Sequence, residues 1–156
     1  MTSTADILDR HPVEARVCEL EFRQFGAVSS FAGPLSTVRC HEDNVVLKRH
    51  LGEAGAGRVL VVDGAGSRRV ALLGDMVAGL AARNGWAGLV LNACVRDVAA
   101  LRLLDVGIKA LGTNPRPSGK LGAGEIDVPV EFGGITFRPG AMLYSDDDGV
   151  VVLDES

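Results

Sequence analysis

The sequence predicts a single mixed α/β domain that is rich in strand, with helices covering part of the sheet. The chain has 156 residues, 47% of them hydrophobic, which is enough to bury about two thirds of its unfolded surface around one core. Its middle part alternates buried-strand runs with helical stretches, a pattern typical of parallel strands joined by crossovers. Residues 126–153 contain period-two runs separated by Gly-Gly, Pro-Gly and Asp-Gly turns, which predicts antiparallel hairpins.

The N-terminal third predicts two short helices and two extended segments. Residues 1–16 are polar with a few apolar positions, which suits a short helix. VCELEFRQFG (17–26) and FAGPLSTVRC (31–40) alternate apolar and polar residues and contain glycine or proline, so we expect strands or extended arms there. NVVLKRHLGEAGAG (44–57) predicts a helix followed by a glycine-rich loop.

The middle of the chain predicts strands and helices in alternation. RVLVVDGAG (58–66) is an apolar run closed by a glycine turn, as expected of a buried strand, and RRVALLGD (68–75) repeats the form. A helix is expected over 75–84, because apolar residues recur there at helical spacing and Gly85 follows at the C-cap position. The next three segments predict a strand, a short helix and a strand: WAGLVLNA (86–93), DVAALRLLD (97–105) and VGIKALGT (106–113).

Composition disfavours several functions. The net charge of -4, the pI near 5.3 and the absence of a dense Lys/Arg run argue against nucleic acid as the main partner. The sequence has no secretory signal pattern and no apolar run near the roughly 18 residues of a membrane span, so we expect a cytoplasmic protein with no membrane partner. Cys18, Cys40 and Cys94 form no metal-binding cluster and are expected to be reduced and buried.

Two glycine-containing motifs are weak evidence for a ligand site. DGAGS (63–67) lacks the third glycine, the opening helix and the ribose-binding acid of a dinucleotide site, so a tight turn is expected. A methyltransferase interpretation of this turn is also disfavoured, because the larger doubly wound domain is missing. SDDDGVVVLDE (145–155) fails as a calcium loop, since aligning Gly149 with the required glycine puts Tyr144 at the first ligand position.

The histidines and the tryptophan give no catalytic signature. His11, His41 and His50 lie in or near polar segments without a nucleophile-elbow or H-E-x-x-H pattern, and surface positions are expected for all three. Trp86 begins a predicted buried strand, so core packing or an interface is expected.

The stretch GDMVAGLAARNGWAGLVLNACVRD (74–97) carries charges at both ends of an apolar unit. Asp75 is separated by twenty residues from the adjacent pair Arg96 and Asp97. Each aspartate precedes or begins a predicted helix and is open to interpretation as an N-cap. The alternative is a ligand site, because the carboxyl ends of parallel strands gather at one sheet edge and helix N-termini there bind anions. Backbone N–H groups, a guanidinium and a metal-binding aspartate would then meet around one small acid.

This stretch resembles the D-X20-R-D motif of the class II 4-hydroxy-4-methyl-2-oxoglutarate / 4-carboxy-4-hydroxy-2-oxoadipate aldolases. The same superfamily includes the regulator of ribonuclease activity A. Further segments are similar to it: QFG, FAGP, STVRC, DVGIKALGTNPR and VEFGGITFRPGAMLYSDDDGVVV. The likeness covers roughly residues 15–153.

The resemblance implies a swivelling, phosphohistidine-domain-like β/β/α sandwich, assembled as a homotrimer with active sites between subunits. It also implies catalysis with a divalent metal and without a lysine Schiff base. It makes Asp97 the ligand of Mg²⁺ or Mn²⁺, Arg96 the cation facing the keto-acid oxygen, and Asp75 the residue that orders metal-bound water. The backbone cradle for the substrate carboxylate would be formed by Gly74, Asp75, Met76 and Val77.

This sequence differs in two ways from the proteins that it resembles, and both differences affect the expected function. Longer aldolases receive an acidic residue from a C-terminal extension of the neighbouring subunit, whereas this sequence stops at Ser156, so a water or another residue is expected as the base. The ribonuclease regulators lack the aspartate after the arginine, whereas Asp97 is present here. We therefore expect a metal-dependent aldolase that acts on a small 2-keto acid and also decarboxylates oxaloacetate through the same pyruvate enolate. The alternative is a non-catalytic regulator that binds ribonuclease E.

Overall fold

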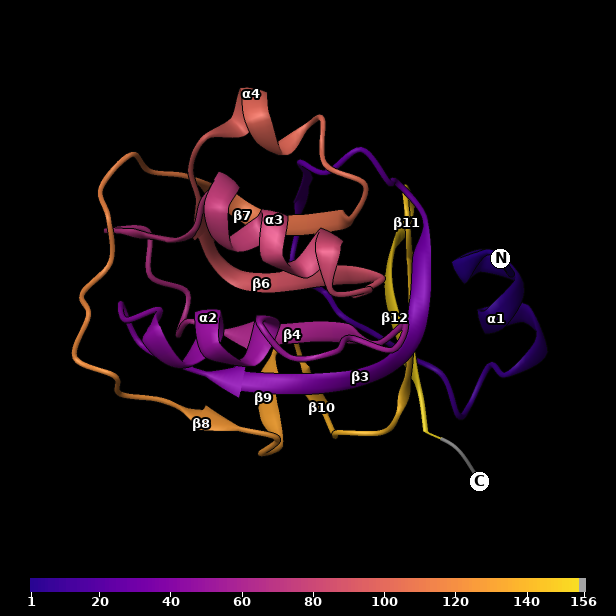
Figure 1. Ribbon diagram of the computed structural model, residues 1–156. Coiled ribbons are helices and arrows are strands. Elements are labelled where there is room, and N and C mark those ends of the chain that lie inside the picture. The colour runs from indigo at the N-terminus through magenta and orange to yellow at the C-terminus, as the bar shows by residue number, and fades with distance from the viewer. Residues whose placement is uncertain (155–156) are drawn as a thin grey trace.

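The computed structural model describes residues 1–154 as one mixed α/β domain (Figure 1). The helices are α1 (Thr4–Arg10), α2 (Val45–Leu51), α3 (Asp75–Arg83) and α4 (Val98–Leu101). The strands are β1 (Arg16–Val17), β2 (Arg23–Gln24), β3 (Phe31–Arg39), β4 (Val59–Asp63), β5 (Ala71–Leu73), β6 (Gly88–Val95), β7 (Gly107–Thr113), β8 (Glu125–Ile126), β9 (Val130–Phe132), β10 (Ile135–Phe137), β11 (Met142–Asp146) and β12 (Gly149–Leu153). Among these residues, no helix is long and apolar enough to cross a membrane.

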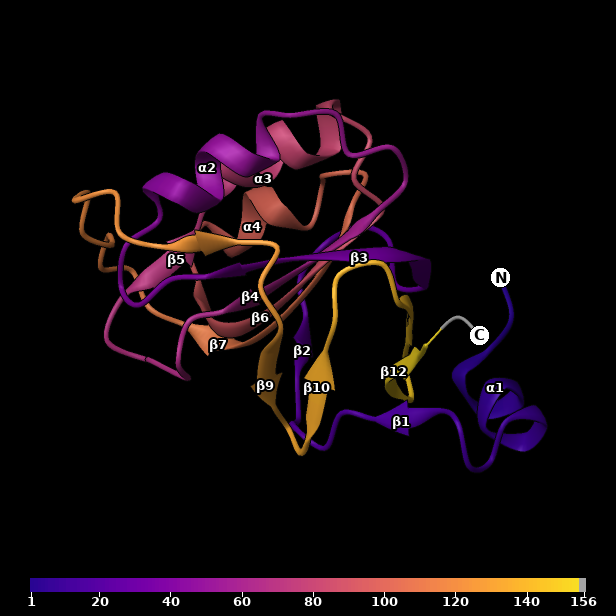
Figure 2. The ribbon, with the colours of Figure 1, turned by 90° about the horizontal axis from the view of Figure 1, so that it is seen from below.

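The centre of the domain is a parallel sheet in the order β3-β4-β6-β7, with β5 paired to the end of β6. Helices α2, α3 and α4 cover one face, and the strands β9 to β12 lie on the other side (Figure 2). In β4, Leu60 and Val62 belong to the core under the helices, whereas Val59 and Val61 belong to the core against the antiparallel strands. Both faces are therefore covered, as the unbroken apolar run predicts.

Strand β3 belongs to both parts of the sheet. Residues 31–34 pair antiparallel with β11, and residues 35–39 pair parallel with β4. The ring of Phe31 lies against β6 and β7, where a Cβ on Gly88 or Gly107 would come within 2.2 or 2.1 Å of it. Glycine at these two positions lets the aromatic ring fill the space where the layers meet.

The C-terminal part confirms two of the three predicted hairpins. β9 and β10 pair across Gly133 and Gly134, whose φ values of 62° and 81° suit the left-handed turn that such hairpins need. β11 and β12 pair across Asp147 and Asp148, and Gly149 is the first residue of β12. The Pro-Gly turn at 139–140 instead connects β10 to β11, which pairs with β3 and β12, so the prediction of a hairpin there is wrong.

The predicted strand over residues 17–26 is reduced to two short pairings at opposite ends of the sheet. β1 pairs with β12, and β2 pairs with β7. Since the six steps from Val17 to Arg23 span at most about 20 Å, the sheet curls until its two ends come close. The buried free cysteines and the buried Trp86 agree with the sequence predictions.

Candidate active site

A cavity of about 590 Å³ lies between α2 and α3, at the edge where the parallel strands end. Its lining comes from β5 and from the segments that follow β3, β5, β6 and β7. All predicted site residues line this one cavity: Gly74, Asp75, Met76, Val77, Arg96 and Asp97. The convergence expected for the carboxyl ends of parallel strands is therefore present. The chemical roles of these residues remain predictions.

Asp75 and Asp97 are in contact in the cavity wall: the N–H of Asp75 donates to Oδ2 of Asp97 at 3.1 Å. The interpretation of each aspartate as the side-chain N-cap of its own helix does not hold, although Asp97 occupies the N-cap position of α4. The N-cap of α3 is Gly74, and Asp97 makes no side-chain bond to its own helix α4. Asp97 instead satisfies a free N–H at the start of α3, and its backbone is left-handed, with φ 60° and ψ 42°.

Gly74 is required by the position of Asp97. A Cβ on Gly74 would lie 2.6 Å from Asp97 Oδ2 and 3.4 Å from Cγ of Arg96. The backbone of Gly74 is extended, at φ -130°, so the constraint is steric and not conformational. Glycine at this position therefore allows Asp97 to contact the backbone of Asp75, at the other end of the D-X20-R-D motif.

Gly74→Ala is expected to lower turnover, because the new methyl group displaces both the Asp97 carboxylate and the Arg96 stem. A displacement on the order of 1 Å can cost about 100-fold in rate, so we expect a loss of about 10- to 100-fold with a small change in melting temperature. Gly79→Ala in α3 is the matched control, since its Cβ would meet only the flexible end of Arg83. Equal activity of the two variants would contradict this account.

The Arg96 guanidinium is available to bind an anion. Its Nη1 donates weakly to the carbonyl of Pro115, at 3.4 Å. No carboxylate within residues 1–154 forms an ion pair with it. Arg96 therefore lines the cavity with no ion-pair partner among residues 1–154.

The opposite wall of the cavity was not predicted from the sequence. It contains Asn44, Lys48, Arg49, Ser118 and Lys120. Nζ of Lys120 donates to Oδ1 of Asn44 at 2.6 Å and to Oγ of Ser118 at 3.3 Å. The available signal was topological: these residues follow the parallel strands β3 and β7, so they reach the same edge as Asp75 and Arg96.

Asp97 fits a divalent metal chemically. Its Oδ1 accepts no hydrogen bond within residues 1–154, and carboxylate oxygen is the donor that Mg²⁺ and Mn²⁺ prefer. The same residues hold no group of three or more His, Cys, Asp or Glu that could bind a metal alone. Mg²⁺ commonly uses one or two protein carboxylates and keeps several waters, so a single aspartate is compatible with a magnesium site.

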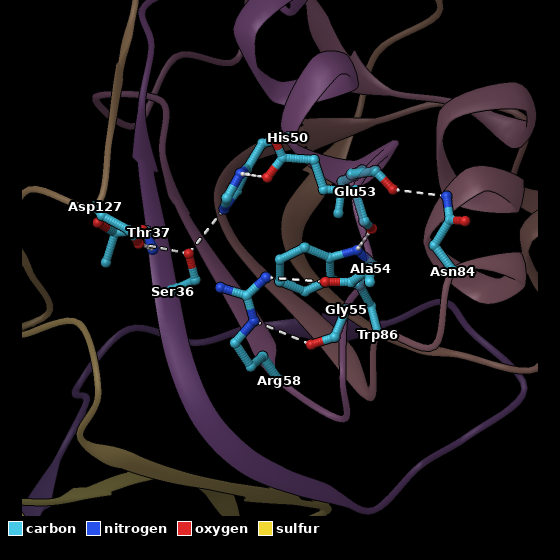
Figure 3. Close-up of polar contacts among 11 residues, drawn as sticks. Ser36, Thr37, His50, Glu53, Ala54, Gly55, Arg58, Asn84, Trp86 and Asp127 are labelled. Carbon is cyan, nitrogen blue, oxygen red and sulfur yellow. Dashed lines mark hydrogen bonds and ion pairs between the residues drawn. The ribbon is translucent and has the colours of Figure 1, made fainter.

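The expected surface position of His50 is wrong: the residue is only 3% exposed, on the face of α2 that packs on the sheet. Figure 3 shows its polar contacts. The imidazole Nε2 lies 2.8 Å from Oγ of Ser36, which donates to Oδ1 of Asp127 at 2.5 Å. On the other side, Nδ1 lies 3.4 Å from Oε2 of Glu53. Ser36 is also buried, and neither Ser36 nor His50 lines the α2–α3 cavity.

The pKa of His50 is lowered from its ordinary value, because burial disfavours the charged ring and Arg58 adds to this, more than Asp127 and Glu53 oppose it. The unfolded chain therefore binds the proton more strongly than the folded protein. His50 contributes stability above the unfolded pKa of about 6.5, and this contribution is lost as the pH falls through the lower, folded pKa.

We expect the free energy of unfolding to fall less steeply between pH 7.5 and 5.5 in His50→Gln than in the unsubstituted protein, as measured in urea. Glutamine can donate to Ser36 but does not titrate. His41→Gln is the control, because His41 is exposed. If both variants keep the original pH dependence, His50 is not the titrating group.

The fold and this cavity define an α/β protein with a mixed-charge site at the carboxyl edge of a parallel sheet. A family model described as RraA-like (Aldolase/RraA) matches residues 4–152, and the chain belongs to this family. The resemblance drawn from the D-X20-R-D motif is thereby confirmed.

Three solved structures are similar to the chain over almost its whole length. One is described as an S-adenosylmethionine: 2-dimethylmenaquinone methyltransferase from Geobacillus kaustophilus, with 46% identity, 99% of this chain and 96% of that chain covered, and a TM-score of 0.97. The RNA-processing inhibitor RraA from Thermus thermophilis has 42% identity, coverage of 99% and 94%, and a TM-score of 0.96. Streptomyces coelicolor RraAS2, an unusual member of the RNase ES inhibitor RraA protein family, has 31% identity, coverage of 98% and 81%, and a TM-score of 0.81.

Proposed function

We propose that the protein is a class II aldolase that cleaves 4-hydroxy-4-methyl-2-oxoglutarate to pyruvate with Mg²⁺ or Mn²⁺, and that it also decarboxylates oxaloacetate. The observation that carries the proposal is the meeting of Asp97, Arg96 and the start of α3 in one cavity. A carboxylate, an unpaired guanidinium and free backbone N–H groups are the groups that a metal-dependent keto-acid lyase needs.

The residues divide the work as follows. The N–H groups of Met76 and Val77 would bind the substrate carboxylate, since the N–H of Asp75 is already bonded to Asp97. Arg96 would donate to the 2-keto oxygen and stabilise the negative charge that develops there when the bond between C3 and C4 breaks. A metal held by Asp97 would supply further positive charge to that oxygen. The Asp75 carboxylate would order water beside it, and the base that takes the 4-hydroxyl proton is water or a residue not yet assigned.

The methyltransferase description of the Geobacillus structure does not transfer well to the residues of this chain. The DGAGS turn is closed by its own contacts: Asp63 Oδ1 accepts from the N–H of Ala65 at 2.9 Å and from Nδ2 of Asn92 at 3.1 Å. A Cβ on Gly64 would lie 2.8 Å from Ala93. The turn also lines no part of the α2–α3 cavity, so the tight-turn interpretation accounts for it.

The second candidate function is a non-catalytic regulator that binds ribonuclease E. It is favoured by the 42% identity to a structure described as an RNA-processing inhibitor, over 99% of this chain. A regulator has no need of the charged cavity, however, whereas an aldolase needs Asp97 and Arg96 together.

Release of pyruvate decides between the two candidates. The purified protein is incubated with 4-hydroxy-4-methyl-2-oxoglutarate or oxaloacetate, and pyruvate is measured with a coupled dehydrogenase. We expect turnover that requires Mg²⁺ or Mn²⁺ and is lost on chelation. If neither acid reacts faster than with metal alone and the protein slows RNA cleavage by ribonuclease E, the regulator proposal replaces the aldolase proposal.

We also propose the swivelling β/β/α arrangement and a homotrimer, which the resemblance implies. The layering of helices, parallel sheet and antiparallel strands is consistent with that arrangement (Figure 2). Exposed apolar side chains at Met76, Leu103 and Leu121 offer surface for association. Light scattering on a sizing column is expected to give about three times the chain mass of 16.3 kDa. A monomer at micromolar concentration would refute the trimer.

A further inference from the structure

One wall of the cavity carries positively charged side chains that form no ion pair with a carboxylate of residues 1–154. Lys48 and Arg49 are exposed at the last turn of α2, and Lys120 approaches from the loop after β7. Within residues 1–154 none of the three forms an ion pair. The whole chain has a net charge of -4, so this local excess of cations is opposite in sign to the protein as a whole.

Lys120 is held in place by neutral groups. Its ammonium donates to Asn44 Oδ1 at 2.6 Å and Ser118 Oγ at 3.3 Å, and an ammonium has three donors. Neither partner cancels its charge, so one donor and the full charge remain for a ligand. Asn44 is itself fixed, because its Nδ2 donates to the carbonyl of Leu72 at 3.0 Å.

Asp43 clamps the loop that carries Lys120. Its side chain is 4% exposed, and Oδ2 accepts backbone N–H groups from three successive loop residues: Leu121 at 2.7 Å, Gly122 at 2.9 Å and Ala123 at 3.3 Å. Oδ1 accepts the N–H of Val45 at 3.1 Å, which ties the clamp to α2. Burial opposes ionisation, but these bonds hold the pKa of Asp43 below its ordinary value, so the carboxylate stays charged.

Lys48 lies on the same wall as Lys120. Residues four apart on a helix share a face, so Lys48 follows one turn after Asn44, the partner of Lys120. Both lysines line the cavity that holds Arg96 and Asp97. A cavity of about 590 Å³ is in the size range of small-molecule sites.

We propose that Lys120 and Lys48 form a second carboxylate subsite, which binds the distal carboxylate of a 2-keto diacid while the first carboxylate lies at the start of α3. Asp43 is the positioning residue that holds Lys120 there. The inference rests on the proposed function for the placement of the reacting end. It adds the residues that would distinguish diacids from keto acids with a neutral tail.

The test compares two substrates that differ only in the distal group. These are 4-hydroxy-4-methyl-2-oxoglutarate and 4-hydroxy-4-methyl-2-oxopentanoate, in which a methyl group replaces the distal carboxylate. The unsubstituted protein is expected to prefer the diacid in kcat/KM. In Lys120→Met this preference should fall by about 10- to 100-fold, mainly through KM, as expected for loss of a charged hydrogen bond. An unchanged preference would overturn the proposal.

Two further variants exclude a general charge effect. Lys120→Arg keeps the charge and should retain most of the preference. Arg138→Met removes one positive charge from an exposed position outside the cavity and should leave the preference unaltered. If Arg138→Met lowers the preference for the diacid as much as Lys120→Met does, the change is caused by the net charge of the protein, and the proposal of a subsite is wrong.

The role of Asp43 is tested by a double variant. Asp43→Asn should lower the preference for the diacid in the same direction as Lys120→Met. In the Lys120→Met background, Asp43→Asn should cause no further fall, because the positioned group is already absent. A further, additive fall would overturn the positioning role.

A binding measurement separates this proposal from the proposed function. Calorimetry with Mg²⁺ compares 2-oxoglutarate with 2-oxobutanoate, so no turnover is needed. Tighter binding of 2-oxoglutarate that disappears in Lys120→Met supports the subsite even if no aldol is cleaved. Equal affinity for the two acids overturns it even if the protein is an aldolase.

Discussion

Asp97→Asn is expected to lose metal-dependent turnover by a factor on the order of 100 or more while the fold persists. Asparagine tolerates the left-handed backbone that Asp97 adopts, at φ 60°. Its amide oxygen can still accept the N–H of Asp75, so the contact between the motif's two ends is kept. What is removed is the negative charge that would hold the metal. The melting temperature should therefore shift by only a few degrees.

Pyruvate release and thermal unfolding of the same preparation check this expectation. Asp105→Asn is the matched control, since Asp105 is exposed and outside the cavity. Asp97→Ala is a poorer choice, because alanine in the left-handed region adds strain that asparagine avoids. Full activity of Asp97→Asn would mean that the carboxylate serves only to hold the start of α3.

Arg96→Ala is expected to lose a similar factor, on the order of 100, that added metal does not restore, because the lost group binds the keto-acid oxygen and not the metal. The guanidinium has no ion-pair partner within residues 1–154, so its removal leaves no unpaired carboxylate behind. Stability should change little. The measurement is oxaloacetate decarboxylation over a range of Mg²⁺ concentrations.

The metal dependence distinguishes the two variants. Asp97→Asn should need much more Mg²⁺ for half-maximal activity, whereas Arg96→Ala should need the same amount and reach a lower maximum. Arg102→Ala, at the end of α4, is the control for the loss of an exposed guanidinium. Recovery of Arg96→Ala at high Mg²⁺ would place Arg96 in metal binding instead of substrate binding.

β4 and β6 were predictable because their apolar runs are buried on both faces. β7 contributes Ile108 and Ala110 to the core under the helices and has the buried Lys109 between them, and α3 has helical spacing followed by Gly85. The N-terminal arm was not predictable in the same way. β1 and β2 are two residues each, and their pairing depends on how far the sheet curls, which is a property of the whole domain.

Only those site residues that belong to one sequence motif were predictable. Asp75, Arg96 and Asp97 lie at fixed spacing in one crossover, so the sequence shows them together. Lys120 enters through a loop whose position depends on Asp43, far away in the chain, and a polar turn gives no sign of that contact. His50 was misplaced because its buried partners, Ser36 and Asp127, come from distant segments.

The contact between Asp75 and Asp97 explains why twenty residues separate the motif's ends. The intervening chain is the remainder of α3, a short connection and all of β6. The end of β6 lies beside the end of β5, where the N–H of Arg96 donates to the carbonyl of Leu73 at 2.9 Å. One added residue in the helix would rotate its end by about 100°, and one in the strand would turn Arg96 to the other face. The spacing of twenty residues is therefore the length of one helix–strand crossover. A relative that keeps Asp75, Arg96 and Asp97 would lose the site if a single residue were inserted between them.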